Sequence, residues 1–153
     1  MAKIFEPYKD TIDLAEDLFE DTGLPQMGIN IKVLATTKAK NVVKVSKANP
    51  TTQYLTSKDV IMVVYEEAFD RLNDDYKSKL MEGALSNVSY DDEKDKLNVE
   101  GDIAKEMFAM RQKYSNYVDI MEASYLTIAQ IEEEEKEKKE QEKAAKAAKK
   151  KGN

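Results

Sequence analysis

The side chains of this chain that could do chemistry are mainly carboxylates, because the sequence contains neither histidine nor cysteine. Histidine acid–base catalysis, cysteine nucleophiles, disulfides and the nitrogen and sulfur ligands that zinc prefers are therefore excluded. One hypothesis is a hydrolase with a carboxylate-only site built from Glu82, Asp91, Asp92 and Glu93. The spacing of these acids does not indicate that they converge on one face, so we favour no catalytic site, no metal and no cofactor.

A second grouping of acids resembles a calcium-binding loop in its spacing. Asp91, Glu93 and Asp95 alternate as such ligands do. Lys96 stands where the loop needs a glycine, and the distal glutamate is missing. The segment 91–95 therefore favours a solvated turn between two short strands, at 88–90 and 96–99.

The charge of the chain is unevenly divided. Residues 132–153 hold seven acidic and eight basic residues, which leaves residues 1–131 with a net charge of −7. An acidic body repels the nucleic-acid backbone, so we expect no nucleic-acid partner. One lysine-rich region could bind phosphate, but it has no arginine and only Tyr54 for stacking, and a solvated strand face is favoured. Its lysines are Lys32, Lys38, Lys40, Lys44, Lys47 and Lys58.

Hydrophobic periodicity predicts an α+β domain over residues 1–131. Its sheet is small, mixed or antiparallel, with helices packed on it. The apolar run at 60–65 predicts a central strand covered on both faces. The strands at 29–34 and 42–45 are expected to pair antiparallel, and 48–53 to form a loop. Helices are predicted at 5–19, 66–72 and 75–87.

A long amphipathic helix is predicted from Asp102 onward. Its apolar residues step by three and four, which favours packing onto the body for the first half and leaves self-association of the second half as an option. Met110, Tyr114, Tyr117 and Met121 are the candidate partner-binding residues. The whole stripe is Ile103, Met107, Met110, Tyr114, Tyr117, Met121, Ser124, Ile128 and Ile131.

The segment 132–153 is rich in lysine, glutamate and alanine, and we expect a solvated helix or a disordered tail. Its basic tip, Lys149 to Lys151, could touch an acidic partner. No stretch is apolar enough for a signal peptide or a membrane span, so the protein is expected in the cytoplasm, with no membrane partner.

From about residue 29 to 114, the order of elements resembles the phage metallopeptidase family, a zincin-like group. The resemblance lies in a strand hairpin, the hydrophobic strand at 59–64, the turn at 68–72 and an acid-rich connection. A helix opening with leucines, a hairpin and a final helix follow. Members of that family carry His-Glu-x-x-His on this helix, which binds zinc and supplies the general base. The resemblance implies a zincin-like core.

In this chain the resemblance places Gly83 at the position of the first histidine, Ala84 at that of the glutamate and Asn87 at that of the second histidine. The family's further histidine would fall near Gly101 and Asp102. The resemblance therefore implies a phage-encoded, catalytically inactive relative that binds a protein partner or has a structural role. Its location would be the host cytoplasm, with virion association as an option. The alternative is a small acidic scaffold or inhibitor, unrelated to peptidases, which binds a host or virion protein and imitates nucleic-acid charge.

A glycine inside a helix is unfavourable by about 0.5–1 kcal/mol relative to alanine, and it often marks the close approach of another backbone. We therefore expect the face of the helix at 83–87 to pack against the last helix near residues 103–107. This face should then be closed to solvent.

Overall fold

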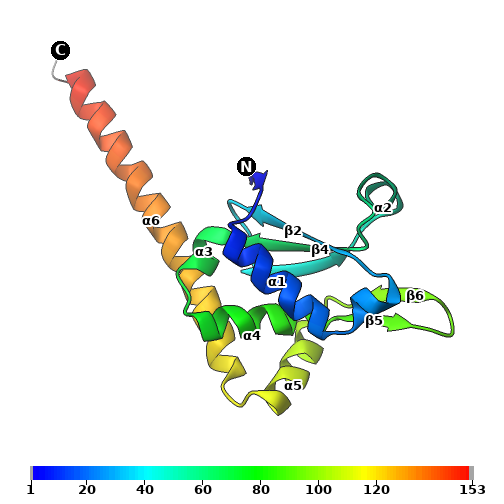
Figure 1. Ribbon diagram of the computed structural model, residues 1–153. Coiled ribbons are helices and arrows are strands. Elements are labelled where there is room, and N and C mark those ends of the chain that lie inside the picture. Colours follow the sequence, from blue (N-terminus) through cyan, green and yellow to red (C-terminus); the bar gives the residue numbers. More distant parts are fainter. Residues whose placement is uncertain (1, 152–153) are drawn as a thin grey trace.

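A computed structural model describes residues 2–151 and shows a mixed α+β fold, as the sequence predicts. The main sheet has four strands in the order β1-β2-β4-β3 (Figure 1). Its strands are β1 (Ile4–Phe5), β2 (Ile31–Thr36), β3 (Val43–Lys47) and β4 (Val60–Tyr65). A separate hairpin consists of β5 (Val88–Asp91) and β6 (Lys96–Val99), where the sequence predicts one.

The expected antiparallel pairing of the second and third strands is wrong, because β4 lies between them. β2 pairs parallel with β4, with Ile31 opposite Val60, and β3 pairs antiparallel with the other side of β4. β4 is apolar on both faces and its buried residues include Met62, so it takes the central position. As a result β3 is an edge strand.

Helices cover the sheet and extend from it. They are α1 (Lys9–Asp21), α2 (Pro50–Thr56), α3 (Glu66–Asp70), α4 (Asp74–Leu85), α5 (Ile103–Lys113) and α6 (Tyr117–Lys151), with a 3₁₀ turn η1 (Leu24–Met27). α2 replaces the loop expected at 48–53. Asn49 caps it by accepting a 2.8 Å hydrogen bond from the Thr52 N–H, and Pro50 starts it.

The core lies between the sheet and the pair α1 and α4, which pack against each other (Figure 1). Phe19 of α1, Val33 and Met62 of the sheet and Leu80 of α4 are all buried there. Burial of these side chains stabilises the fold by about 1.5–3 kcal/mol each.

Buried Glu66 ties the end of β4 to the start of α1. Its Oε1 accepts hydrogen bonds from the Tyr8 N–H at 2.9 Å and from the Thr11 hydroxyl at 2.7 Å. A carboxylate at a helix N-terminus is also favoured by the helix dipole. Glu66 therefore holds α1 in register with the sheet.

The single long helix expected from Asp102 is wrong. α5 ends at Lys113, Tyr114 is extended with φ −132° and ψ 110°, and α6 starts at Tyr117. The heptad stripe is therefore divided between two helices that pack against each other. The Tyr114 hydroxyl donates a 2.8 Å hydrogen bond to Glu82 of α4, which holds the bend against that helix.

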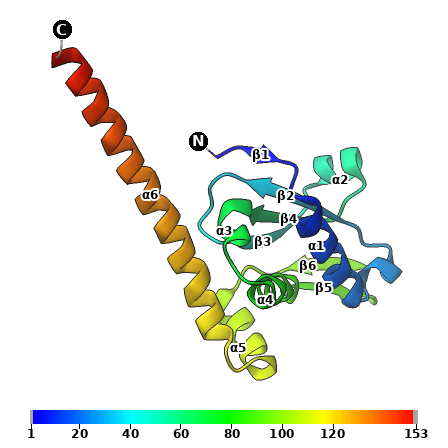
Figure 2. The ribbon, with the colours of Figure 1, turned by 60° about the vertical axis from the view of Figure 1, so that its left-hand side comes forward.

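α6 has two different halves. Up to Ile131, which is buried, it packs on α3, α4 and α5. Residues 132–151, which we call the arm, continue as helix and project away from the body in both views (Figures 1 and 2). Every arm residue whose burial is described, 132–150, is exposed. Within residues 2–151, no helix has the length and hydropathy needed to cross a bilayer.

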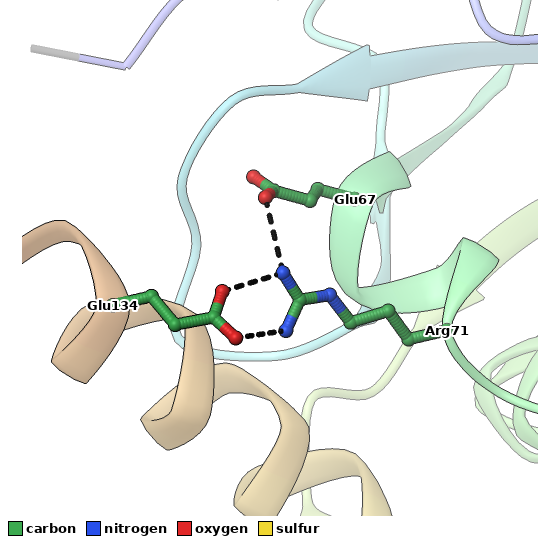
Figure 3. Close-up of polar contacts among 3 residues, drawn as sticks. All are labelled: Glu67, Arg71 and Glu134. Carbon is green, nitrogen blue, oxygen red and sulfur yellow. Dashed lines mark hydrogen bonds and ion pairs between the residues drawn. The ribbon is translucent and has the colours of Figure 1, made fainter.

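The arm is clamped where it leaves the body (Figure 3). The Arg71 guanidinium donates two hydrogen bonds to Glu134, at 3.1 and 2.7 Å, and a longer one to Glu67 at 3.5 Å. The hydrogen bond from Arg71 lowers the pKa of Glu134 and raises the pKa of the guanidinium. This bidentate pair joins the root of the arm to the end of α3, although it is largely exposed to solvent and adds little stability.

Candidate functional site

The candidate site is the side of α4 that carries Gly83 and Ala84, together with Asn87 just after the helix. The family resemblance assigns these three positions to metal and base. Asn73 starts α4 by accepting a 2.8 Å hydrogen bond from the Tyr76 N–H. α4 ends at Leu85, two residues before the predicted end at 87, so Gly83 and Ala84 lie on the helix and Asn87 lies in the turn that follows it. This side faces α5, α6 and the edge strand β3.

The space in front of Gly83 is filled by Tyr117, the first residue of α6. A Cβ built on Gly83 would lie 2.8 Å from Tyr117 Cζ and closer still to its hydroxyl. Tyr117 itself is completely buried. A glycine is needed at this position because the tyrosine ring comes so close. The expected closure of this side is therefore observed, with Tyr117 as the main contact.

Glu106 of α5 completes the closure through a polar network. Its Oε2 accepts a 2.9 Å hydrogen bond from the Tyr117 hydroxyl, and its Oε1 accepts a 2.8 Å bond from the Asn87 side-chain amide. Burial, followed by the negative charge of Glu106, raises the pKa of Tyr117 well above its usual value. Tyr117 therefore stays neutral and acts as a donor.

A small cavity of about 110 Å³ adjoins this network, between β3, α4 and the first turns of α6. Its polar lining includes Asn87, Glu106 and Ser124, and Lys44 and Glu100 lie at its rim. This volume accommodates a few water molecules or the end of one side chain, but not a folded substrate.

The residues present do not fit the zinc that the family resemblance implies. Of the three motif positions, only Asn87 has a polar side chain, and its amide is already bonded to Glu106. The hydroxyl of Tyr117 occupies the space beside Gly83. Among residues 2–151, no three carboxylates lie together in a way that could hold a metal ion.

The carboxylates of the alternative hydrolytic site do not share a contact network. Glu82 lies on α4 and accepts hydrogen bonds from Tyr114 and Lys113. Asp91 caps the β5–β6 turn by accepting a 3.0 Å hydrogen bond from the Glu93 N–H. Asp92 and Glu93 are exposed in that turn.

The acids whose spacing resembles a calcium-binding loop, Asp91, Glu93 and Asp95, also belong to the β5–β6 hairpin. Asp95 has a φ of 47°, and it accepts a hydrogen bond from the Tyr90 hydroxyl. Asp91 accepts bonds from the turn N–H groups. These carboxylates therefore shape the hairpin, as expected for a solvated turn.

Most of the candidate partner-binding residues lie inside the chain's own core. Met110, Tyr117 and Met121 have exposed fractions of 3%, 0% and 9%. Tyr114 is half-buried, with its hydroxyl on Glu82 and the Lys79 ammonium 4.6 Å from its ring centroid. These side chains close the body, so a partner surface must be sought elsewhere. The second half of the stripe, for which self-association was considered, is also buried within the chain at Ser124, Ile128 and Ile131.

Sequence reasoning missed Glu106 and the closing role of Tyr117. Both belong to the region predicted as one helix. A separation of 11 residues would place them on the same side of such a helix, three turns apart. Only the bend at Tyr114 brings both onto α4. The unfavourable glycine at position 83 was the one signal in the sequence for this contact.

Comparison with known protein families, with curated proteins and with solved structures gives no match. The family resemblance therefore depends on the order of elements and on the residues described above.

Proposed function

We propose that this protein is a catalytically inactive, zincin-like relative of the phage metallopeptidases that acts by binding a protein partner. The observation that carries the proposal is the closed side of α4. Gly83 and Asn87 lie together beside the edge strand β3, where the family resemblance expects a metal site, but Tyr117 and Glu106 fill that side.

The arrangement supports binding rather than hydrolysis on chemical grounds. Hydrolysis of a peptide by a zincin needs a metal, an activated water and a general base on this helix. Here Ala84 stands at the position of the general base. The Tyr117 hydroxyl occupies the space that a metal ion would need. What remains open is the rim of the small cavity, where the edge of β3 and the charged Lys44 and Glu100 are available to a partner.

The experiment tests zinc binding, peptide hydrolysis and the capture of a partner. Purified protein titrated with zinc should bind no stoichiometric ion, and a mixed peptide library should remain intact. The rim variant Lys44→Glu/Glu100→Lys should lose a partner that the wild type retains from expressing cells. The variant Lys38→Glu, away from the cavity, should keep it. One tightly held zinc per chain, or hydrolysis that a chelator abolishes, would contradict the proposal.

We place the protein in a phage-infected cell, acting in the host cytoplasm or carried in the virion. The support is the family resemblance, and fractionation of infected cells tests it.

A second candidate function is an acidic scaffold or inhibitor that imitates nucleic-acid charge. The observation that favours it is a row of exposed acids on α1. Reversing three of them should then abolish capture of the partner, while the rim variant should leave it unchanged. The row comprises Asp10, Asp13, Glu16, Asp17, Glu20 and Asp21.

A further inference from the structure

The far end of the arm carries the densest positive charge of the chain. Between residues 143 and 151 there are five lysines and no acid. Lys143, Lys146, Lys149 and Lys150 are exposed, and within residues 2–151 none of these four lies in ion-pair range of a carboxylate. Lys143, Lys146 and Lys150 follow steps of three and four, so they share one side of the helix.

The arm separates this charge from the acidic body. At a rise of about 1.5 Å per residue, Lys143 lies about 17 Å and Lys150 about 27 Å beyond Glu132. These distances are about two and three Debye lengths at physiological ionic strength. The negative charge of residues 1–131 is therefore largely screened at the tip, and the tip acts as an independent cationic surface. Both views show this separation (Figures 1 and 2).

The arm is built to remain helical without packing. Its residues are mostly strong helix formers, and near its root lysine follows glutamate by four residues at Glu132 and Glu135. Lysine near the C-terminus also complements the helix dipole. The Arg71–Glu134 clamp holds the arm at its root (Figure 3).

We propose that the basic end of the arm binds the phosphate backbone of duplex nucleic acid without reading its sequence. The arm has no apolar side chain larger than alanine, so a protein partner would gain only exposed ion pairs, worth about 0–1 kcal/mol each. It also lacks the large apolar residues that anchor interfacial helices in membranes. Duplex nucleic acid differs because each neutralised phosphate releases condensed counterions.

The arm contains lysine but no arginine and no aromatic residue, and this composition favours contacts to phosphate over contacts to bases. Bidentate base recognition and base stacking use side chains that the arm does not have. From the charge of the body alone we expected no nucleic-acid partner, but the arm carries the opposite charge at a distance. This inference does not depend on the proposed function of the α4 side.

The experiment measures the binding of full-length protein to two labelled 20-base-pair DNA duplexes of unrelated sequence by fluorescence anisotropy, across a salt series. We expect similar affinity for both duplexes and a log–log salt slope of about −4, because four described lysines reach phosphates. In Lys143→Gln/Lys146→Gln/Lys150→Gln, glutamine keeps helix propensity while charge is removed. Its affinity at 50 mM salt should fall at least tenfold and its slope should approach −1.

A matched control is Lys38→Gln/Lys40→Gln/Lys47→Gln, which removes three exposed lysines of the body that lie outside the proposed binding rim. It should bind as the wild type does. Absent binding at 50 mM salt, an equal loss in both triple variants, or tighter binding to phosphatidylserine vesicles than to DNA at the same salt would each overturn the proposal. Circular dichroism of each variant verifies that the arm stays helical.

Discussion

The two halves of α6 form one continuous helix, but different interactions stabilise them. Residues 117–131 alternate buried and exposed positions, and Tyr117, Ile120 and Ile131 are almost completely inaccessible. Residues 132–150 have no buried position. The first half is helical because its apolar side packs on the body, and the second because it is composed of strong helix formers. Helix continuity therefore says little about what a segment does.

This contrast also separates two ways in which the chain can act. The packed half places Tyr117 against Gly83 and closes the side of α4 on which a zincin-like site would lie. The projecting half carries charge away from the body. Substitutions in the first half should therefore change folding stability, and substitutions in the second should change binding.

The largest effect is expected for Tyr117→Ala. Removing a fully buried aromatic side chain lowers the free energy of unfolding by about 3–5 kcal/mol. Urea titration monitored by circular dichroism measures this loss. The control is Tyr125→Ala on the same helix, which should have a smaller effect because that side chain is 39% exposed. Equal losses at both positions would show that the packed half does not depend on Tyr117.

Glu106→Ala is expected to lower the free energy of unfolding by about 1–3 kcal/mol, because it leaves one buried and one half-buried donor without this acceptor. The donors are the Tyr117 hydroxyl and the Asn87 amide. Glu106→Gln keeps an acceptor oxygen and should have the smaller effect. A similar stability for wild type and Glu106→Ala would mean that this network contributes nothing to closure.

Alkaline pH should weaken the packed half through Tyr117. Its pKa is raised in the folded state, so its stabilising contribution is complete below the unfolded value near 10 and is lost as pH rises above it. The linkage is about 1.4 kcal/mol per pH unit for one such group. Stability measured between pH 9 and 11 should therefore fall more steeply in wild type than in Tyr117→Phe. Identical slopes would refute the assignment.

Deleting residues 132–153 should have the smallest effect on stability. Residues 132–150 of this segment are all exposed. The melting temperature should therefore fall by less than about 5 °C, on the order of 1 kcal/mol for a domain of this size. Differential scanning calorimetry gives the value, and Arg71→Ala controls for loss of the clamp alone. A larger fall would show that the arm packs on the body.

The sequence was informative where a pattern reported on its own surroundings. The uniform apolar run of β4 identified the central strand, although Ile61 and Val63 on its second face are only half-buried. The cost of glycine at position 83 indicated a close approach. It was uninformative where the outcome depended on distant segments. Nothing local in β2 or β3 specifies that β4 separates them, and the stripe from Ile103 to Ile131 does not record the bend at Tyr114.

The same limit explains the candidate site. Helical spacing predicted Gly83 and Asn87 on one side of a helix, but α4 ends at Leu85, and the groups that close this side come from α5 and α6. A heptad stripe shows that a side is buried without showing against what. Met110, Tyr117 and Met121 were therefore assigned to a partner although they pack within the chain.

The central claim is that the side of α4 at Gly83 is closed by Tyr117, and one substitution tests it in two environments. A Cβ at Gly83 would collide with the tyrosine, whereas a Cβ at Gly101 would meet no atom within 4 Å. Denaturant titration of Gly83→Ala should show a loss on the order of 1 kcal/mol or more, because overpacking exceeds the gain in helix propensity. Gly101→Ala should be unchanged or stabilised by several tenths of a kcal/mol. A gain in stability for Gly83→Ala, like that at Gly101, would mean that the site is open and the account is wrong.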